Sequence, residues 1–391
     1  MDLSIKIQNP FVTVLLPVYN GGTYLSDAIQ SILNQSYKDF ELLIINDCST
    51  DHSEDVIRTF NDPRIILLNN TVNLGQTKSL NVGLRLAKGK YIARMDADDL
   101  AFSTWLESLV GFIQKNPQYP LVSPNALVID DNNHIMRTFD LYACWEDMLL
   151  RSITSSPVNH VGSIFDREAV IQEGGYDEDY RISADYHLWI RLIAKKYQFA
   201  SVPKTLVAIR RHQQSLSLSQ SERETEELST IIQKHVTHLT RGKIPVEKLK
   251  NVCLAFYNTG KLNDQEFAQA MDTIEEIYAN LVPPFPIHKE TLLNWSKRQR
   301  KTLYIKRVFY HIYQKKYDKI RDITLQFIQQ RNLCSLSTGL YIGSLLGKIC
   351  LSPLPKVYDF MLWLKTQKMI MKNRSLKAEL KQLVSHNQTR Q

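Results

Sequence analysis

The sequence predicts an α/β fold, in which a mostly parallel sheet carries helices on both faces and is followed by a mainly α-helical C-terminal region. Two observations support this prediction. Over about the first 210 residues, short apolar runs alternate with segments of helical periodicity. Polar and acidic residues gather where the apolar runs end, which is where open parallel sheets bind their ligands.

The expected strands and helices alternate along the chain. Segment 11–17 (FVTVLLP) is continuously apolar, as expected of a strand that is buried on both faces. Segment 24–35 then places four apolar side chains on one helical face. The next elements, strand and helix in turn, are expected at 40–46, 51–60, 64–68, 78–87 and 90–95. This order predicts parallel strands joined by right-handed crossovers.

The character of the chain changes near residue 211. Segment 213–227 is polar and rich in serine, which indicates a loop or linker. Helices are expected beyond it at 226–235, 264–280, 297–331 and 361–383. Segment 333–351 is apolar and about as long as a membrane-spanning helix. Its serines, glycines and Lys348 favour an interfacial helix or a buried helix contact instead.

These features divide the chain into three expected regions: a sheet domain at 1–215, a helical extension at 216–285 and a basic helical region at 286–391. The last region holds 21 Lys and Arg against 5 Asp and Glu, whereas the rest of the chain holds 27 against 35. Such a basic region is typical of contact with an anionic membrane surface or a nucleic acid. A solvated helical face or an oligomer contact would have the same composition.

The cysteines and the N-terminal residues indicate a cytoplasmic protein. The five cysteines are widely spaced and form no CxxC pair, so neither a disulfide framework nor a zinc site is expected. The first ten residues contain no apolar stretch of the kind found in signal peptides.

A cluster of acids follows the strand expected at 90–95. Asp96, Asp98 and Asp99 crowd three carboxylates into four residues. Such groups repel one another unless a cation or hydrogen-bond donors compensate them. Mg²⁺ and Mn²⁺ take oxygen ligands of this kind together with phosphates, so the cluster predicts a metal and phosphate site. The alternative is that Asp98 and Asp99 cap a helix that begins near Ser103.

Two nucleotide motifs are missing. No GxGxxG follows the first strand, where PVYNGG stands instead, and no GxxxxGK[ST] occurs in the chain. These observations argue against a nicotinamide or flavin site and against a P-loop nucleotidase. Asp47 directly follows the second strand, where it could accept hydrogen bonds from a ligand or serve as a turn residue.

Several motifs together resemble the family 2 glycosyltransferases, which have the Rossmann-like GT-A fold. The elements PVYN, DCSTD and DAD stand at the ends of the first, second and fourth expected strands. NHV, GGY and DYHLW follow in the order and at the distances usual in that family. The resemblance covers residues 10–215, just over half of the chain.

The resemblance implies a role for each matching residue. Nucleotide contacts are implied for Pro17, Val18, Tyr19, Asn20, Asp47, Asn73, Arg94, Asp96 and Ala97. Asp98 would ligate a divalent cation, Mn²⁺ or Mg²⁺, that bridges the diphosphate. Asp96 would contact that cation or the ribose, and His212 would approach the cation or diphosphate unless it is a surface histidine.

The resemblance also implies that Asp185 is the general base for the acceptor hydroxyl, with a helix N-cap as the alternative reading. The family often has acids one position before and two positions after this base. Ala184 and His187 stand there, and the second difference is expected to change acceptor contacts.

The function expected from these residues is inverting transfer of a sugar from a nucleotide-diphosphate sugar, with UDP as the expected nucleotide. The expected acceptor is a saccharide or lipid-linked saccharide in surface polysaccharide biosynthesis. Region 286–391 would rest on the inner face of the cell membrane.

Two alternatives stay open. A sugar nucleotidyltransferase would need a basic glycine-rich loop, but residues 18–23 carry no basic side chain. A non-catalytic nucleotide- or nucleic-acid-binding protein on a transferase-like scaffold is disfavoured by Asp98 and Asp185. Nucleic acid is not an expected partner, because region 286–391 shows no RRM, zinc-finger or KH signature.

Overall fold

The computed structural model describes residues 9–141, 144–212, 221–283, 286–313 and 379–380. The chain forms two compact units, divided near residues 153–155 and 219–220. The first unit contains, in chain order, β1 (Val12–Val18), α1 (Gly22–Leu33), β2 (Phe40–Asn46), α2 (Ser53–Arg58), β3 (Ile65–Asn69), α3 (Gln76–Leu86), β4 (Tyr91–Arg94), β5 (Leu100–Ala101), α4 (Trp105–Lys115), β6 (Leu121–Ile129), β7 (Ile135–Phe139), α5 (Trp145–Arg151), β8 (Ile164–Asp166), α6 (Arg167–Gln172), α7 (Ala184–Ala194) and β9 (Phe199–Arg210).

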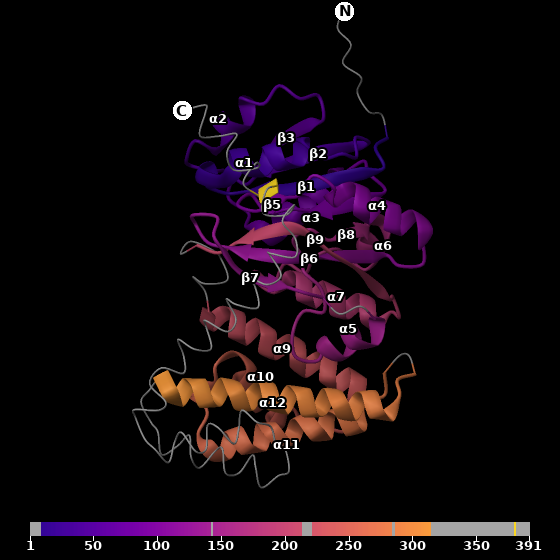
Figure 1. Ribbon diagram of the computed structural model, residues 1–391, viewed down its shortest axis with the longest axis vertical. Helices are drawn as coiled ribbons and strands as arrows, with labels where there is room; N and C mark the ends of the chain where they lie inside the picture. The colour runs from indigo at the N-terminus through magenta and orange to yellow at the C-terminus, as the bar shows by residue number, and fades with distance from the viewer. Residues whose placement is uncertain (1–8, 142–143, 213–220, 284–285, 314–378, 381–391) are drawn as a thin grey trace, which may run out of the picture. The chain divides into compact units, whose positions relative to one another are not determined.

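Among the described residues of the first unit, nine strands make one sheet in the order β3-β2-β1-β4-β8-β6-β9-β5, with β7 beside β6 (Figure 1). Strands β1 to β4 pair in parallel, as do β6 and β9. Strands β5, β7 and β8 pair with their neighbours in antiparallel fashion. The three longest pairings, β6 with β9, β1 with β2 and β2 with β3, are all parallel. The sheet is therefore mainly parallel, and the predicted α/β fold class is confirmed.

Helices cover both faces of this sheet because alternate side chains of a strand point to opposite faces. Leu16 of β1 lies in one hydrophobic cluster with Ile29 of α1 and Leu109 of α4. Leu15 points to the other face, where it lies against Gly83 of α3. Every residue of β1 and β2 is buried, as the continuous apolar runs predict.

The seven elements expected between residues 11 and 95 are all present. The first and last residues of each lie within two positions of those expected. The prediction of a loop at 213–227 is wrong from residue 221 onward, where α9 begins. Two features explain this helix. Arg223 and Glu227 form an ion pair one turn apart, with Nε and Oε1 3.0 Å apart. The buried residues Leu228, Ile231 and Ile232 then supply an apolar face.

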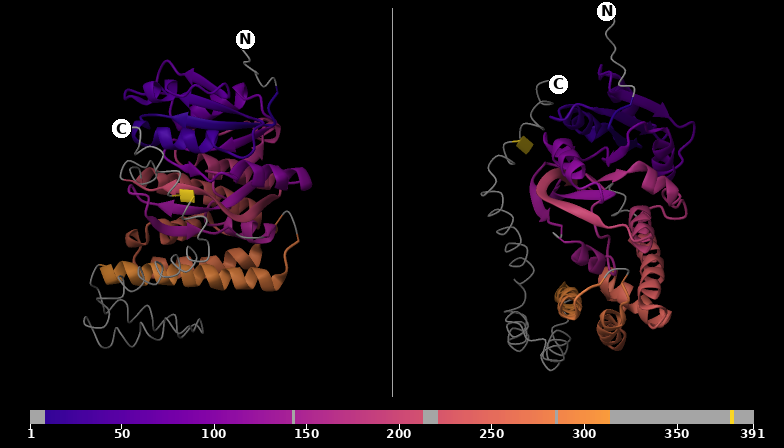
Figure 2. Two further views of the ribbon diagram at one scale, coloured as in Figure 1. Left: turned by 45° about the horizontal axis from the view of Figure 1, so that its top comes forward. Right: turned by 90° about the vertical axis from the view of Figure 1, so that its right-hand side faces the viewer.

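The second unit contains α9 (Ser221–Thr240), α10 (Val246–Tyr257), a 3₁₀ turn (Thr259–Lys261), α11 (Asp264–Asn280) and α12 (Lys289–Tyr313). Helices α11 and α12 lie side by side in this unit (Figure 2). A capping box formed by Asn263 and Glu266 fixes the beginning of α11 where the sequence predicts it. Helix α10 was not predicted, and α12 begins eight residues before its expected start.

The remaining helical predictions fall largely beyond the described residues. Segment 333–351, positions 314–331, and all of 361–383 except residues 379–380 lie outside them. The division of the chain at 215 and 285 stays a prediction. Within the described part of the chain, no helix combines the length and the apolar character needed to cross a membrane.

Residues 379–380 belong to the first unit and contact its sheet near β5 (Figure 1). The Glu379 carboxylate accepts hydrogen bonds from the backbone N–H and the hydroxyl of Ser103, at 2.6 and 2.5 Å. Leu380 is only 4% exposed and packs with Leu100 and Phe102. A contact from near the C-terminus therefore covers the strand that follows the acidic cluster.

Two helical glycines offer a matched test of the packing on the sheet. A Cβ at Gly83 would lie 2.2 Å from Leu15 Cδ1, whereas a Cβ at Gly111 of α4 would have nothing within 4 Å. Alanine in a helix gains about 1 kcal/mol over glycine, but overpacking a core costs about 1–3 kcal/mol. We expect Gly111→Ala to raise the free energy of unfolding by about 1 kcal/mol and Gly83→Ala to lower it. Urea denaturation of both variants measures this difference, and equal effects would contradict the described contact of α3 with β1.

Candidate active site

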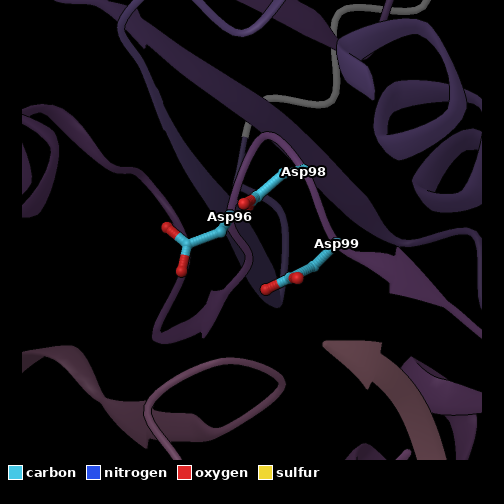
Figure 3. Close-up of side chains that lie close together, drawn as sticks. All are labelled: Asp96, Asp98 and Asp99. Carbon is cyan, nitrogen blue, oxygen red and sulfur yellow. The ribbon is translucent and has the colours of Figure 1, made fainter. Parts of the chain in front are cut away.

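The acidic cluster forms a tight turn between β4 and β5. The Met95 N–H donates to the Leu15 carbonyl oxygen at 3.2 Å. This bond continues the pairing of β4 with β1 for one residue before the chain turns. One carboxylate oxygen from each of Asp96, Asp98 and Asp99 then lies within 4.8 Å of the other two (Figure 3). Helix α4 has Thr104 as its N-cap, so the alternative that Asp98 and Asp99 cap this helix is wrong.

Each acid of this turn has a partner from elsewhere in the first unit. Arg94 Nη2 lies 2.6 Å from Asp96 Oδ1, and His212 Nε2 lies 2.9 Å from Asp98 Oδ2. The Arg210 backbone N–H donates to Asp99 Oδ1 at 2.7 Å. Burial and the neighbouring carboxylates raise the pKa of Asp98, and they raise the pKa of Asp99 further because Asp99 is more deeply buried.

The donor set of this turn fits a hard divalent cation. Carboxylate oxygens are the ligands that Mg²⁺ and Mn²⁺ prefer, and Mn²⁺ also accepts imidazole. Asp96 and Asp98 are half-buried and keep contact with solvent, and the His212 imidazole lies beside Asp98. Asp99 is 2% exposed, and its Oδ1 is engaged by a backbone N–H. Asp96, Asp98 and His212 are therefore the residues that could hold the cation.

His212 reaches the turn from 114 residues further along the chain. It follows β9, whose residues Val207 and Ala208 pair with Ala101 and Leu100 of β5. This short antiparallel ladder brings the end of β9 beside the turn. The His212 side chain is 15% exposed, so it is not the freely solvated surface histidine of the alternative interpretation.

The loops after β1 and β2 are bound together by hydrogen bonds. Asn20 adopts a φ of 52°, a left-handed conformation that asparagine tolerates better than most residues. Its Oδ1 accepts the Thr50 backbone N–H at 2.8 Å, and its own N–H donates to Ser49 Oγ at 3.0 Å. Gly22 N–H donates to Asp51 Oδ2 at 3.1 Å. Asn20 and Asp51 therefore hold the two loops together.

The expected nucleotide residues of the first loop differ in their exposure. Pro17 and Val18 are buried, while the Tyr19 side chain is 53% exposed. Ala97 is half-buried within the acidic turn, and a Cβ at Gly21 would lie 3.1 Å from its Cβ. Among these residues, Tyr19 presents the largest free side-chain surface to a ligand.

Asp47 is 2% exposed and binds the loop that precedes α3. Its Oδ1 accepts hydrogen bonds from Asn70 Nδ2 at 2.7 Å and Leu74 N–H at 2.9 Å, and its Oδ2 accepts from Gly75 N–H at 2.8 Å. A carboxylate has about four acceptor positions, so these three bonds use most of them. Asp47 thereby fixes the loop that exposes Asn73.

Asp185 lies at the beginning of α7, and Ser183 is the N-cap of that helix. The alternative that Asp185 is the N-cap is therefore wrong. Burial raises the pKa of Asp185 to about 6, while the Tyr186 backbone N–H and the Arg94 charge oppose this rise and Asp96 adds to it. The residue as a whole is half-buried.

Two further groups line the region around Asp185. His160 Nε2 and the Tyr176 hydroxyl lie 2.7 Å apart, and burial lowers the pKa of His160 well below its usual value. The His187 ring stacks on Tyr180 with a centroid distance of 4.2 Å, and its Nδ1 lies 3.4 Å from Asp177 Oδ2. His187, where the family often has an acid, thus ties α7 to the preceding loop.

Sequence reasoning missed two contributors to the acidic turn. Gln76, the first residue of α3, donates from Nε2 to Asp96 Oδ1 at 3.0 Å. Arg210 contacts both Asp98 and Asp99. The place of Gln76 after the third strand could have indicated a role, and so could the place of Arg210 two residues before His212.

Comparison with known proteins identifies the family. The sequence profile described as Glycosyl transferase family 2 matches residues 13–170. An uncharacterized glycosyltransferase of Haemophilus influenzae is 30% identical over 272 residues, which cover 65% of this chain and 82% of the relative. An uncharacterized glycosyltransferase of Methanocaldococcus jannaschii is 31% identical over 209 residues, which cover 52% of this chain and 72% of the relative.

A solved structure agrees with the fold. The crystal structure of S. aureus TarS 1–349 in complex with UDP-GlcNAc aligns with a TM-score of 0.50 and 16% sequence identity, covering 78% of this chain and 91% of that one. This likeness concerns the fold alone, and it confirms the GT-A-like arrangement expected from the motifs. The profile match and the two relatives together show that the chain is a glycosyltransferase and belongs to glycosyltransferase family 2.

Proposed function

We propose that this glycosyltransferase is a metal-dependent, inverting enzyme that takes its sugar from a UDP-sugar. The observation that carries the proposal is the meeting of Asp96, Asp98 and His212 at the carboxyl edge of the sheet. This group of side chains suits a divalent cation beside a diphosphate. The comparison with TarS, which was crystallised with UDP-GlcNAc, supports a nucleotide-sugar donor of this kind.

The donor would bind along the loops that follow β1, β2 and β3. Tyr19 offers an exposed ring to the base, and Asp47 would accept a donor group of the nucleotide at its remaining acceptor position. Pro17 and Val18 would contribute backbone groups, because their side chains are buried. Asn20, Asn73, Asp96 and Ala97 complete the proposed nucleotide site. The Arg94 side chain is fully buried, so it would act on the nucleotide through its ion pair with Asp96.

The transfer needs a base on the acceptor side and charge compensation on the donor side. Asp185 takes the proton of the acceptor hydroxyl as the acceptor oxygen bonds to the anomeric carbon. The bond from that carbon to the diphosphate breaks on the opposite face, which inverts the configuration. A divalent cation held by Asp96, Asp98 and His212 would neutralise the charge that develops on the departing diphosphate.

The acceptor and the location are proposed from charge and chemistry. A saccharide or lipid-linked saccharide hydroxyl would be the acceptor, in surface polysaccharide biosynthesis. The excess of basic residues at 286–391 would hold the cytoplasmic enzyme on the inner face of the cell membrane. Lys297, Arg298 and Lys301 of α12 are exposed and could take part in this contact.

Isothermal titration of UDP with and without Mn²⁺ tests the donor site. We expect binding that depends on Mn²⁺ and that weakens more than about tenfold in Asp98→Ala, because a ligand of the cation is lost. Asp55→Ala, which removes an exposed acid on α2, is the matched control and should bind as the wild type does. Binding of another nucleotide instead of UDP would contradict the proposed donor, and binding of none would favour a non-catalytic protein.

The pH dependence of transfer tests Asp185. Because its pKa is raised to about 6, kcat/KM should rise with pH up to about 6 and then level off. Asp185→Asn should lower kcat by about 10²- to 10⁴-fold while leaving UDP binding intact. An unchanged kcat would contradict the proposed base.

Asp185→Asn, which should lower kcat, should raise the stability of the folded protein. The pKa of Asp185 in the folded state exceeds its unfolded value, so its contribution to stability falls as pH rises from about 4 to 6. Asparagine carries no charge, and the residue keeps some solvent contact. We therefore expect Asp185→Asn to raise the free energy of unfolding by about 1–2 kcal/mol at pH 8 and by much less near pH 4. Urea denaturation at both pH values measures the difference, and a lower stability at pH 8 would contradict the buried charge.

Sedimentation with vesicles tests the proposed membrane contact. Reversing Lys297, Arg298 and Lys301 to Glu should weaken binding to phosphatidylserine vesicles about 100-fold or more, since each basic residue near such a surface contributes about 1 kcal/mol. Reversing the exposed residues Arg241, Lys243 and Lys250 of the same unit is the control and should have less effect. Binding to RNA or DNA but not to vesicles would support the alternative of a nucleic-acid-binding protein.

A further inference from the structure

Arg210, the last residue of β9, is 3% exposed and contacts two separate turns. Its Nε donates to the Asp98 carbonyl oxygen at 2.9 Å. Its Nη1 donates to Asn133 Oδ1 at 2.7 Å and to the Asp130 carbonyl oxygen at 3.2 Å, in the turn between β6 and β7. The guanidinium group also lies 4.3 Å from the centroid of the Tyr24 ring.

Arg210 makes two hydrogen bonds to the acidic turn, one from its side chain and one from its backbone. Arg210 donates its side-chain N–H to the backbone of Asp98, while its backbone N–H donates to the side chain of Asp99 at 2.7 Å. Both residues are almost fully buried. A buried charged group that makes well-formed hydrogen bonds holds its partners firmly, because losing a bond leaves an unpaired polar group.

This pair of bonds lies next to the residues proposed to hold the cation. Asp98 precedes Asp99, and His212 follows Arg210 by two residues. The two bonds therefore fix the main chain on both sides of the contact between Asp98 Oδ2 and His212 Nε2. Tyr24, which donates from its hydroxyl to Asp131 Oδ1 at 3.1 Å, joins α1 to the same arrangement.

We propose that Arg210 and Asp99 are positioning residues, which together hold Asp98 and His212 in place for a divalent cation. In this proposal, which rests on the proposed function, Asp99 is not itself a ligand. Arg210 donates its side-chain N–H groups to carbonyl and amide oxygens, so it acts on the cation site through the backbone of Asp98 rather than by touching the donor.

The variants Arg210→Gln and Arg210→Lys test the role of the guanidinium group. Neither side chain can reproduce both the bond to the Asp98 carbonyl and the bonds to the β6–β7 turn. Mn²⁺ affinity, measured by isothermal titration without nucleotide, should fall about 10- to 100-fold, as it does when groups that orient metal ligands are removed. An unchanged affinity in folded variants would overturn the proposal.

Arg64→Lys is the matched control for the loss of a structural arginine. Arg64 donates hydrogen bonds to the Asp62 carboxylate and to the Leu33 carbonyl oxygen. Its guanidinium group lies 4.6 Å from the centroid of the Phe40 ring. Its loss should lower the melting temperature without changing Mn²⁺ affinity. Equal loss of Mn²⁺ affinity in both variants would mean that general destabilisation, not positioning, explains the effect.

The role of Asp99 is tested by Asp99→Asn and Asp99→Ala. The asparagine amide oxygen can still accept the Arg210 N–H, whereas alanine cannot. Mn²⁺ affinity should stay within about threefold of the wild type in Asp99→Asn and fall about tenfold or more in Asp99→Ala. A large loss in Asp99→Asn would show that the carboxylate ligates the cation and would contradict the proposed role of Asp99.

Hydrogen exchange of the metal-free protein separates this proposal from the proposed function. Peptides covering residues 96–101 and 207–212 should exchange about tenfold faster in Arg210→Gln than in the wild type, and no faster in Arg64→Lys. If the wild type bound no Mn²⁺ but exchange rose in Arg210→Gln, the proposed metal dependence would be wrong. The bonds of Arg210 and Asp99 would still be shown to hold the two segments in place. Unchanged exchange in both peptides would overturn the positioning pair itself.

Discussion

Three carboxylates within four residues at the end of β4 are the constraint on which the site depends. One oxygen from each lies within 4.8 Å of the other two, so each carboxylate raises the energy of ionising the others. Compensation comes from Arg94 in the same strand and from Arg210 and His212 at the end of β9. The pairing of β9 with β5 is therefore important for the turn. It places Arg210 and His212 beside acids that lie over 100 residues earlier in the chain.

The loops around this turn are fixed by bonds within the protein. Asn20 joins the loops after β1 and β2, and Asp47 binds the loop before α3 through two backbone N–H groups. Loops held in this way have less conformational entropy to lose when a ligand binds. The sheet therefore presents its carboxyl edge as a preformed surface, and the exposed side chains of Tyr19 and Asn73 extend from it.

The sequence predicts the first half of the sheet well because its determinants are local. Each of β1 and β2 is a run of consecutive buried residues, and α1 has a clear apolar face. Strands β6 and β9 were not predicted, since their pairing shifts register near Pro124 and Asn125 and joins residues far apart in the chain. The site follows the same rule. Motif order indicates Asp98, His212 and Asp185, and the place of Arg210 beside His212 indicates that it lies near them. The sequence does not show which main-chain carbonyl oxygens Arg210 contacts.

Arg94 interacts electrostatically with both the acidic turn and Asp185. This fully buried guanidinium bonds Asp96 in the acidic turn, and its charge lowers the pKa of Asp185 while the charge of Asp96 raises it. The basicity of Asp185 therefore depends on the net charge of the turn as well as on its own burial. Any positive charge brought to Asp96 would lower the pKa of Asp185 and favour its ionised form at neutral pH. In the proposed mechanism, a cation bound beside Asp96 would therefore favour the ionised form of Asp185, the proposed base.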